Sequence, residues 1–196
     1  MRWDVTRLVV GPLATNCYVV AAGGAAVVVD PGAHAPRIIE AVRGLDVQAV
    51  LVTHGHPDHV GGVDEFLAGT EVPFMAPAAD AALVKEYVSA EPVRWLRDGD
   101  RLECGALTLE FVATPGHTPG SCCYYAPGVL FSGDTLFAGG VGRTDLPGGF
   151  GEALFASIRE RIFTLADDTV VYPGHGECTT VRREKESNPF FGPEWV

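Results

Sequence analysis

Four side chains with metal-binding nitrogen or oxygen atoms occur within six residues, in the run THGHPDH. His54 and His56 stand two apart in a stretch expected to be extended, so both side chains point to one side. Pro57 suits the first turn of a helix, so Asp58 and His59 are expected in that turn. Their side chains then point in other directions than those of His54 and His56. One ion cannot take all four with good geometry, whereas two neighbouring ions can. Imidazole and carboxylate donors without a thiolate suit zinc, iron or manganese and do not favour a purely structural zinc site.

Three further residues of the same chemistry stand in loops beside glycine or proline. His117 lies in TPGHTPG, Asp134 follows the apolar run that ends in FSG, and His175 lies in YPGHG. Taken alone, each of these residues is typical of a surface loop or turn. The remaining histidine, His34, fits none of these patterns, and we expect it at the surface.

The surrounding chain predicts short strands that end at these side chains, with helices between them. The expected strands are Trp3–Val10, Cys17–Ala21, Ala25–Val29, Ala49–Val52, Arg101–Cys104, Leu107–Val112, Cys122–Tyr125, Val129–Phe131 and Val170–Tyr172. The expected helices are Ala35–Arg43, a segment from Pro57 with Val60, Val63 and Leu67 on one face, one with Ala81, Val84 and Val88, one with Leu154, Ile158 and Ile162, and Val181–Ser187. Each half is strand-rich first and helical later. We therefore expect one α/β domain over 1–196, with pseudo-equivalent halves of roughly 1–95 and 96–196, two packed sheets and helices outside them.

The amino-acid composition limits the expected binding partners and the expected cellular compartment. The formal net charge of −11 argues against nucleic acid, which needs a basic surface, and against docking on anionic membranes. The N-terminal segment has no apolar run long enough for a signal peptide or a membrane span. The five cysteines lack metal-finger spacing, and we expect reduced, mostly buried thiols in a cytoplasmic protein, with Cys122 and Cys123 on opposite faces of a strand. The sequence makes no prediction of the oligomeric state.

The run THGHPDH, followed in order by His117, Asp134 and His175, resembles the metallo-β-lactamase-fold hydrolases over essentially the whole chain. The resemblance implies an αββα four-layer sandwich with the metal site at one edge of the two sheets. It implies one metal ion held by His54, His56 and His117, a second held by Asp58, His59 and His175, and Asp134 as the bridge between them. Asp30, in an Asp-Pro-Gly turn, matches a carboxylate that orients a ligand.

Two further stretches are similar to the short, single-domain glyoxalase II-like branch of that family. They run from Asp134 through Gly-Arg-Thr-Asp at 142–145, and from Gly-His-Gly at 174–176 to Asn-Pro-Phe-Phe at 188–191. Glyoxalase II hydrolyses S-D-lactoylglutathione. Arg143 stands at the spacing of a basic residue that grips a glutathione carboxylate in that enzyme, and Tyr124 matches another position near the substrate. The alternative for Arg143 is a structural ion pair with Asp145.

The chain departs from glyoxalase II at the positions that contact glutathione. We expect no counterpart here of the C-terminal helical domain, which supplies further contacts in the full-length enzyme. Gly176 and Glu177 stand where an aromatic residue is expected after the last histidine, and Asp145 replaces another aromatic. Basic residues of the final predicted helix offer a substitute or simply a solvated face; they are Arg182, Arg183 and Lys185.

The implied cofactors are two divalent metal ions, with zinc as the expected metal and iron or manganese as alternatives. The resemblance implies that two such ions lower the pKa of a shared water, and that the metal-bound hydroxide attacks the carbonyl of a small thioester, for which a glutathione-derived thioester is one candidate. Asp58 orients this nucleophile as well as binding metal. A thiolate leaves readily near neutral pH, so the reaction needs no strong general acid.

Two other functions remain as alternatives. Persulfide dioxygenase has the same fold, carries a similar Gly-Arg-Thr-Asp stretch, and binds one iron with two histidines and one aspartate of the set. The presence of His59 and His175 favours the binuclear hydrolase. A non-catalytic metal-binding protein is the further alternative, which the complete set of ligands disfavours.

Overall fold

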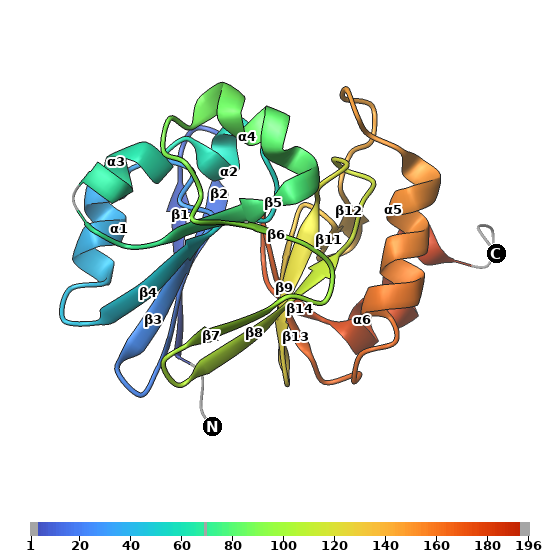
Figure 1. The fold of residues 1–196 in the computed structure, drawn as a ribbon. Coiled ribbons are helices and arrows are strands. Elements are labelled where there is room, and N and C mark those ends of the chain that lie inside the picture. Colours follow the sequence, from blue (N-terminus) through green and yellow to red (C-terminus); the bar gives the residue numbers. More distant parts are fainter. Residues whose placement is uncertain (1–3, 69, 193–196) are drawn as a thin grey trace.

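The computed structural model describes residues 4–68 and 70–192, and within them two six-stranded sheets pack against each other with helices on both outer faces (Figure 1). Side chains from both sheets form one buried apolar cluster between them, including Leu51 from the first sheet and Leu109 and Phe131 from the second. Separate apolar clusters lie under the helices on each side. The layers are therefore helix, sheet, sheet and helix, which confirms the predicted αββα sandwich.

The first sheet has the strand order β1-β2-β3-β4-β5-β6. Its strands are β1 (Asp4–Val10), β2 (Thr15–Ala22), β3 (Ala25–Val29), β4 (Asp46–Leu51), β5 (Phe74–Pro77) and β6 (Arg94–Leu96). The first three pair antiparallel, whereas β3 to β6 run parallel. All five residues of β3 are apolar and buried, as expected for a central strand covered on both faces.

The second sheet has the order β14-β13-β10-β9-β8-β7. Its strands are β7 (Arg101–Cys104), β8 (Leu107–Ala113), β9 (Cys122–Ala126), β10 (Val129–Gly133), β13 (Val170–Pro173) and β14 (Thr179–Thr180), and a small hairpin is formed by β11 (Leu136–Phe137) and β12 (Gly140–Val141). Strands β10 and β13 are parallel neighbours. In β9, Cys122 faces the core between the sheets and Cys123 the outer helices, as predicted.

Helices cover the outer faces in two groups (Figure 1). Over the first sheet lie α1 (Ala35–Ala41), α2 (Pro57–Val60), α3 (Val63–Ala68), the 3-10 turn η1 (Ala78–Asp80) and α4 (Ala81–Tyr87). Over the second lie α5 (Gly151–Ser157), the π-helical turn η2 (Ile158–Ile162), α6 (Val181–Ser187) and the 3-10 turn η3 (Pro189–Phe191). Across the described ranges, no helix combines the length and apolarity needed to cross a membrane.

The structure differs from the predicted elements in two respects. The single helix expected from Pro57 is two short helices, because the chain between them is fixed to the Asp-Pro-Gly turn. Gly62 N donates to Pro31 O at 2.9 Å, and a Cβ at Gly62 would lie only 2.5 Å from that oxygen. The short strands β5, β6, β11, β12 and β14 were not predicted. Trp3, expected in the first strand, lies outside the described residues.

Tyr124 was expected near the substrate, and its position in the structure is different. Its side chain is fully buried in the core between the sheets, at 0% exposure. Its hydroxyl donates to Val52 O at 2.8 Å, which links β9 to the end of β4. The tyrosine therefore joins the two sheets and does not line a cleft, so the expected substrate contact is corrected.

This position predicts that Tyr124→Phe lowers the free energy of unfolding by about 1–3 kcal/mol, because the buried Val52 carbonyl loses its donor. Denaturant unfolding measures the change. Tyr125→Phe is the matched control, since Tyr125 is the next residue of the strand and only half-buried. Equal losses in the two variants would contradict this assignment.

Candidate metal centre

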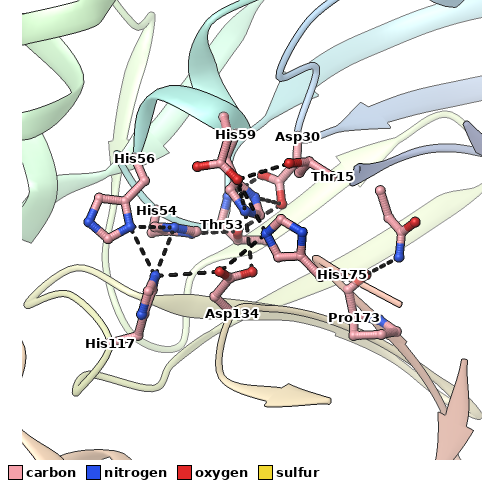
Figure 2. Close-up of polar contacts among 12 residues, drawn as sticks. Thr15, Asp30, Thr53, His54, His56, His59, His117, Asp134, Pro173 and His175 are labelled. Atoms are coloured by element: carbon pink, nitrogen blue, oxygen red, sulfur yellow. Dashed lines mark hydrogen bonds and ion pairs between the residues drawn. The ribbon is translucent and has the colours of Figure 1, made fainter. Parts of the chain in front are cut away.

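The ends of parallel strands bring the predicted ligands to one edge of the molecule. In the first sheet, β3 and β4 are parallel, and the chain continues into Asp30 after β3 and towards His54 after β4. In the second sheet, β10 and β13 are parallel and are followed by Asp134 and, after one glycine, His175. Parallel neighbours end at the same edge of a sheet, and Figure 2 shows the side chains from both sheets pointing towards one another.

The remaining ligands come from the connections at this edge. His56 precedes α2, whose first residues carry Asp58 and His59, and His117 lies in the loop between β8 and β9. Close approach requires a glycine before His175. A Cβ at Gly174 would lie 2.2 Å from Asp134 Oδ1 and 2.6 Å from His59 Cε1, so any larger residue displaces the ligands.

Three imidazole nitrogens converge to form the first group. His54 Nε2 lies 3.1 Å from His56 Nδ1 and 3.2 Å from His117 Nε2, and His56 Nδ1 lies 2.9 Å from His117 Nε2. Nitrogen ligands about 2.0–2.1 Å from a tetrahedral zinc ion are about 3.3 Å apart. The triangle is therefore close to the size that one such ion needs.

Asp58, His59 and His175 form a second group beside the first. Asp58 Oδ2 lies 3.2 Å from His175 Nε2 and 3.4 Å from His59 Nε2. Asp134 lies between the groups, with Oδ1 3.2 Å from His59 Nε2, and Oδ2 3.5 Å from His175 Nε2 and 3.6 Å from His117 Nε2. One carboxylate thus contacts ligands of both groups, which is the position that a bridge between two ions requires.

Hydrogen bonds at the outer nitrogens direct the inner lone pairs towards the centre. His117 Nδ1 donates to Arg143 O at 2.7 Å, and His175 Nδ1 to Leu13 O at 3.1 Å. Because a carbonyl only accepts, each ring carries a proton on Nδ1, and Nε2 is the atom that faces the centre and would bind a metal ion. Such outer partners fix the ring orientation of metal-bound histidines.

Asp30 has this supporting role for two other ligands (Figure 2). Its Oδ2 accepts from His59 Nδ1 at 2.9 Å and from Thr53 Oγ1 at 2.8 Å, and Thr53 Oγ1 lies 3.1 Å from His54 Nδ1. The backbone of Asp30 has φ of 53°, a left-handed conformation that costs a non-glycine residue energy. The strained backbone of Asp30 thus places its carboxylate where it contacts His59 and Thr53.

The charges of the centre call for a cation. Among the described residues, His59 Nε2 and Asp134 Oδ1 are buried without a hydrogen-bond partner, although they are 3.2 Å apart. Burial opposes charge on His59, but the Asp134 and Asp30 carboxylates outweigh it and raise the pKa of His59 well above its usual value. Hydrogen bonds to Asp134 and Asp58 likewise raise the pKa of His175 to about 9. Divalent ions supply this positive charge through lone pairs already directed at them, so the donor set fits two metals.

An open cleft of about 470 Å³ leads to the centre. It is lined by ligands of both groups and by apolar side chains such as Leu13, Phe137 and Val141. Arg143 also lines the cleft, while its guanidinium donates to both carboxylate oxygens of Asp145, each at 2.7 Å. The ion pair expected as the alternative for Arg143 is therefore present, and its contact with a substrate carboxylate stays a prediction. His34 is exposed, as predicted.

Comparison with known proteins identifies the family. The family model of the metallo-beta-lactamase superfamily matches residues 10–175, which include the seven residues of the centre. The chain belongs to this superfamily. Among its superfamily relatives, a probable metallo-hydrolase of Bacillus subtilis is 39% identical, with 97% of each chain covered. A hydroxyacylglutathione hydrolase of Haemophilus influenzae is 38% identical, with 84% of this chain and 86% of the relative covered.

Solved structures of the superfamily have the same fold. The BLEG-1 B3 metallo-beta-lactamase is 35% identical, with a TM-score of 0.87 over 96% of this chain and 100% of that one. TTHA1623 in a di-iron-bound form is 37% identical, with a TM-score of 0.86 over 95% and 100%. ETHE1 from Myxococcus xanthus is 30% identical, with a TM-score of 0.83 over 95% and 83%.

The charge of the centre predicts that metal stabilises the fold. At a free-metal concentration 100 times the dissociation constant, each ion contributes about 2.7 kcal/mol, which is a rise in Tm of about 5–10 °C for a chain of this size. Thermal unfolding with excess zinc and after dialysis against a chelator measures the difference. Magnesium is the control, because it prefers oxygen ligands. An equal Tm in zinc and in chelator would contradict the metal assignment.

Proposed function

We propose that this protein is a metal-dependent thioester hydrolase of the glyoxalase II type, acting on S-D-lactoylglutathione or a related acyl thioester. The observation that carries the proposal is the convergence of six nitrogen and oxygen donors in two groups of three, with Asp134 as a seventh between them. The hydroxyacylglutathione hydrolase among the relatives supports the substrate class.

The proposed site holds one ion at His54, His56 and His117 and a second at Asp58, His59 and His175. Zinc is the preferred metal, and the di-iron form of TTHA1623 supports iron as an alternative. Two ions bound there would lower the pKa of a water and polarise the substrate carbonyl.

We assign the orientation of the attacking water to a side chain of the proposed metal site. Asp58 Oδ2 accepts from Thr15 Oγ1 at 2.8 Å, and this hydrogen bond supports the proposed role of Asp58 in orienting the attacking water. Attack forms a C–O bond to the acyl carbon and breaks its C–S bond, and the electron pair leaves with sulfur as a thiolate. No lysine, tyrosine or cysteine lies among the described residues that line the cleft, which suits a leaving group that needs no general acid.

The cleft also supports a substrate with two parts. A second hollow of about 510 Å³ adjoins it and shares Val141 and Arg143 as a common wall. Leu154, Phe155 and Phe190 line the far side of this hollow. An acyl group placed at the ligands thus leaves its thiol part extended past Arg143.

Asp58→Asn tests the orienting role. It is expected to lower kcat on S-D-lactoylglutathione by about 100-fold or more while two metals per chain remain, because an amide still offers an oxygen ligand. Parallel kinetics and metal analysis separate the two effects. Asp167→Asn is the control, since Asp167 pairs with Lys185 outside the cleft. A fall in activity that only mirrors lost metal would refute the orienting role.

Asp145 is expected to compete with a substrate carboxylate for Arg143. Asp145→Asn then lowers KM for S-D-lactoylglutathione by about two- to five-fold, since an exposed ion pair is weak, and Arg143→Gln raises it. An uncharged thioester of N-acetylcysteamine is the control substrate, whose KM is expected to stay constant. Equal changes for both substrates would argue against a carboxylate contact at Arg143.

Persulfide dioxygenase is the second candidate, supported by the similarity to ETHE1. Such an enzyme needs one iron, whereas here Asp58, His59 and His175 form a further group of ligands. Oxygen uptake with glutathione persulfide decides between the two. One iron per chain with oxygen uptake would replace the hydrolase proposal. Bound metal without hydrolysis of thioesters, lactones or phosphodiesters would instead indicate a non-catalytic metal-binding protein.

A further inference from the structure

We propose that Asp80 is a positioning residue of the metal centre, and that its buried carboxylate fixes the three-histidine group by joining two ligand segments. Asp80 ends η1, at the start of α4, and touches none of the ligand nitrogens. Its role depends on the proposed metal centre but not on which thioester the enzyme hydrolyses.

The hydrogen bonds of Asp80 flank all three ligands of the group. Oδ2 accepts from Gly55 N at 2.9 Å, and Gly55 stands between His54 and His56. The same oxygen accepts from Thr118 Oγ1 at 2.7 Å, and Oδ1 accepts from Gly120 N at 2.6 Å. Thr118 directly follows His117. One carboxylate therefore holds the loop after β4 against the loop between β8 and β9, which belong to different sheets.

Asp80 is tightly packed against both ligand loops. Its exposure is 2%, and a Cβ at Gly120 would lie 2.5 Å from both Asp80 Cγ and Asp80 N. On the other side, a Cβ at Gly55 would lie 2.9 Å from Leu83 Cβ. Both ligand loops thus contact η1 and α4 directly through glycine, and a shift of the carboxylate moves them.

The buried side chain of Asp80 is not balanced by a basic residue. No Lys or Arg in the described part of the chain forms an ion pair with it, so its hydrogen bonds alone offset the cost of burial. All three partners are donors, and both oxygens of the Asp80 side chain accept from them. An amide would place its NH₂ against one of these donors and push one ligand loop away.

Asp80 and Asp30 support different ligands of the metal centre. Asp30 contacts His59 directly and reaches His54 through Thr53, whereas no hydrogen bond of Asp30 reaches His56 or His117 in the described residues. Asp80 acts on those two ligands. Loss of its carboxylate is therefore expected to weaken one ion and spare the other.

Cobalt(II) titration of the metal-free protein tests this role. Its visible absorption follows the two ions, and the spectra of His56→Ala and His175→Ala assign each band to a group. Asp80→Asn is expected to weaken the ion of the three-histidine group by about 10–100-fold and to change the other by less than about three-fold. Thr118→Val is expected to act in the same direction, and Thr118→Ser, which keeps the hydroxyl, to restore affinity.

Asp64→Asn is the matched control, because Asp64 also accepts from two backbone N–H groups, those of Ser89 and Ala90, outside the centre. Its cobalt titration is expected to equal that of the wild type. Unchanged binding in Asp80→Asn, equal weakening of both ions, or identical behaviour of Thr118→Val and Thr118→Ser would overturn the proposal. The Thr118 pair decides the question if Asp80→Asn does not fold. An absence of thioesterase activity leaves the titration unaffected, so the two proposals fail separately.

Discussion

The rest of the structure depends on one constraint: the fold brings seven metal-binding side chains together at one edge. Histidine nitrogens and the oxygens of Asp58 and Asp134 converge at one edge, and two of these atoms are buried without hydrogen-bond partners among the described residues. Protons offset part of this unfavourable arrangement, because the neighbouring carboxylates raise the pKa of His59 and of His175. Cations relieve it directly. The same preorganisation that is unfavourable for the bare protein makes the centre suitable for metal-assisted hydrolysis.

Hydrogen bonds join the two sheets directly beside the ligands and so fix the positions of these side chains. Cys122 N donates to Thr53 O at 2.9 Å, next to His54, and Asn16 N donates to Gly174 O at 2.7 Å, next to His175. The Tyr124 hydroxyl adds a third connection between the sheets. Parallel strands from both halves end at this edge, so each ligand loop begins on a rigid strand. The sandwich thus holds the centre as a frame, while the cleft beyond it remains open for substrate.

Most of the correct predictions from the sequence came from the spacing of residues that are close to one another in the chain. The cluster from His54 to His59 is recognisable because its members are neighbours, and the strands before it are apolar runs. His117, Asp134 and His175 needed the resemblance, since nothing local distinguishes them from turn residues. The ion pair of Arg143 with Asp145 spans two positions, and the sequence offered it as the alternative to a substrate contact. Asp80 was missed, because its partners lie 25 to 40 positions away and only the packing of the two sheets brings them together. Tyr124 was misplaced because a motif position does not specify which face of a strand a side chain occupies.

The central claim is that these seven side chains form one binuclear centre. Anomalous X-ray diffraction from crystals of the metal-loaded protein, recorded at the absorption edge of the bound metal, tests it most directly. The expected result is two peaks, one among His54, His56 and His117 and one among Asp58, His59 and His175, with Asp134 between them. A single peak at full metal saturation, with the second group of ligands empty, would contradict the account.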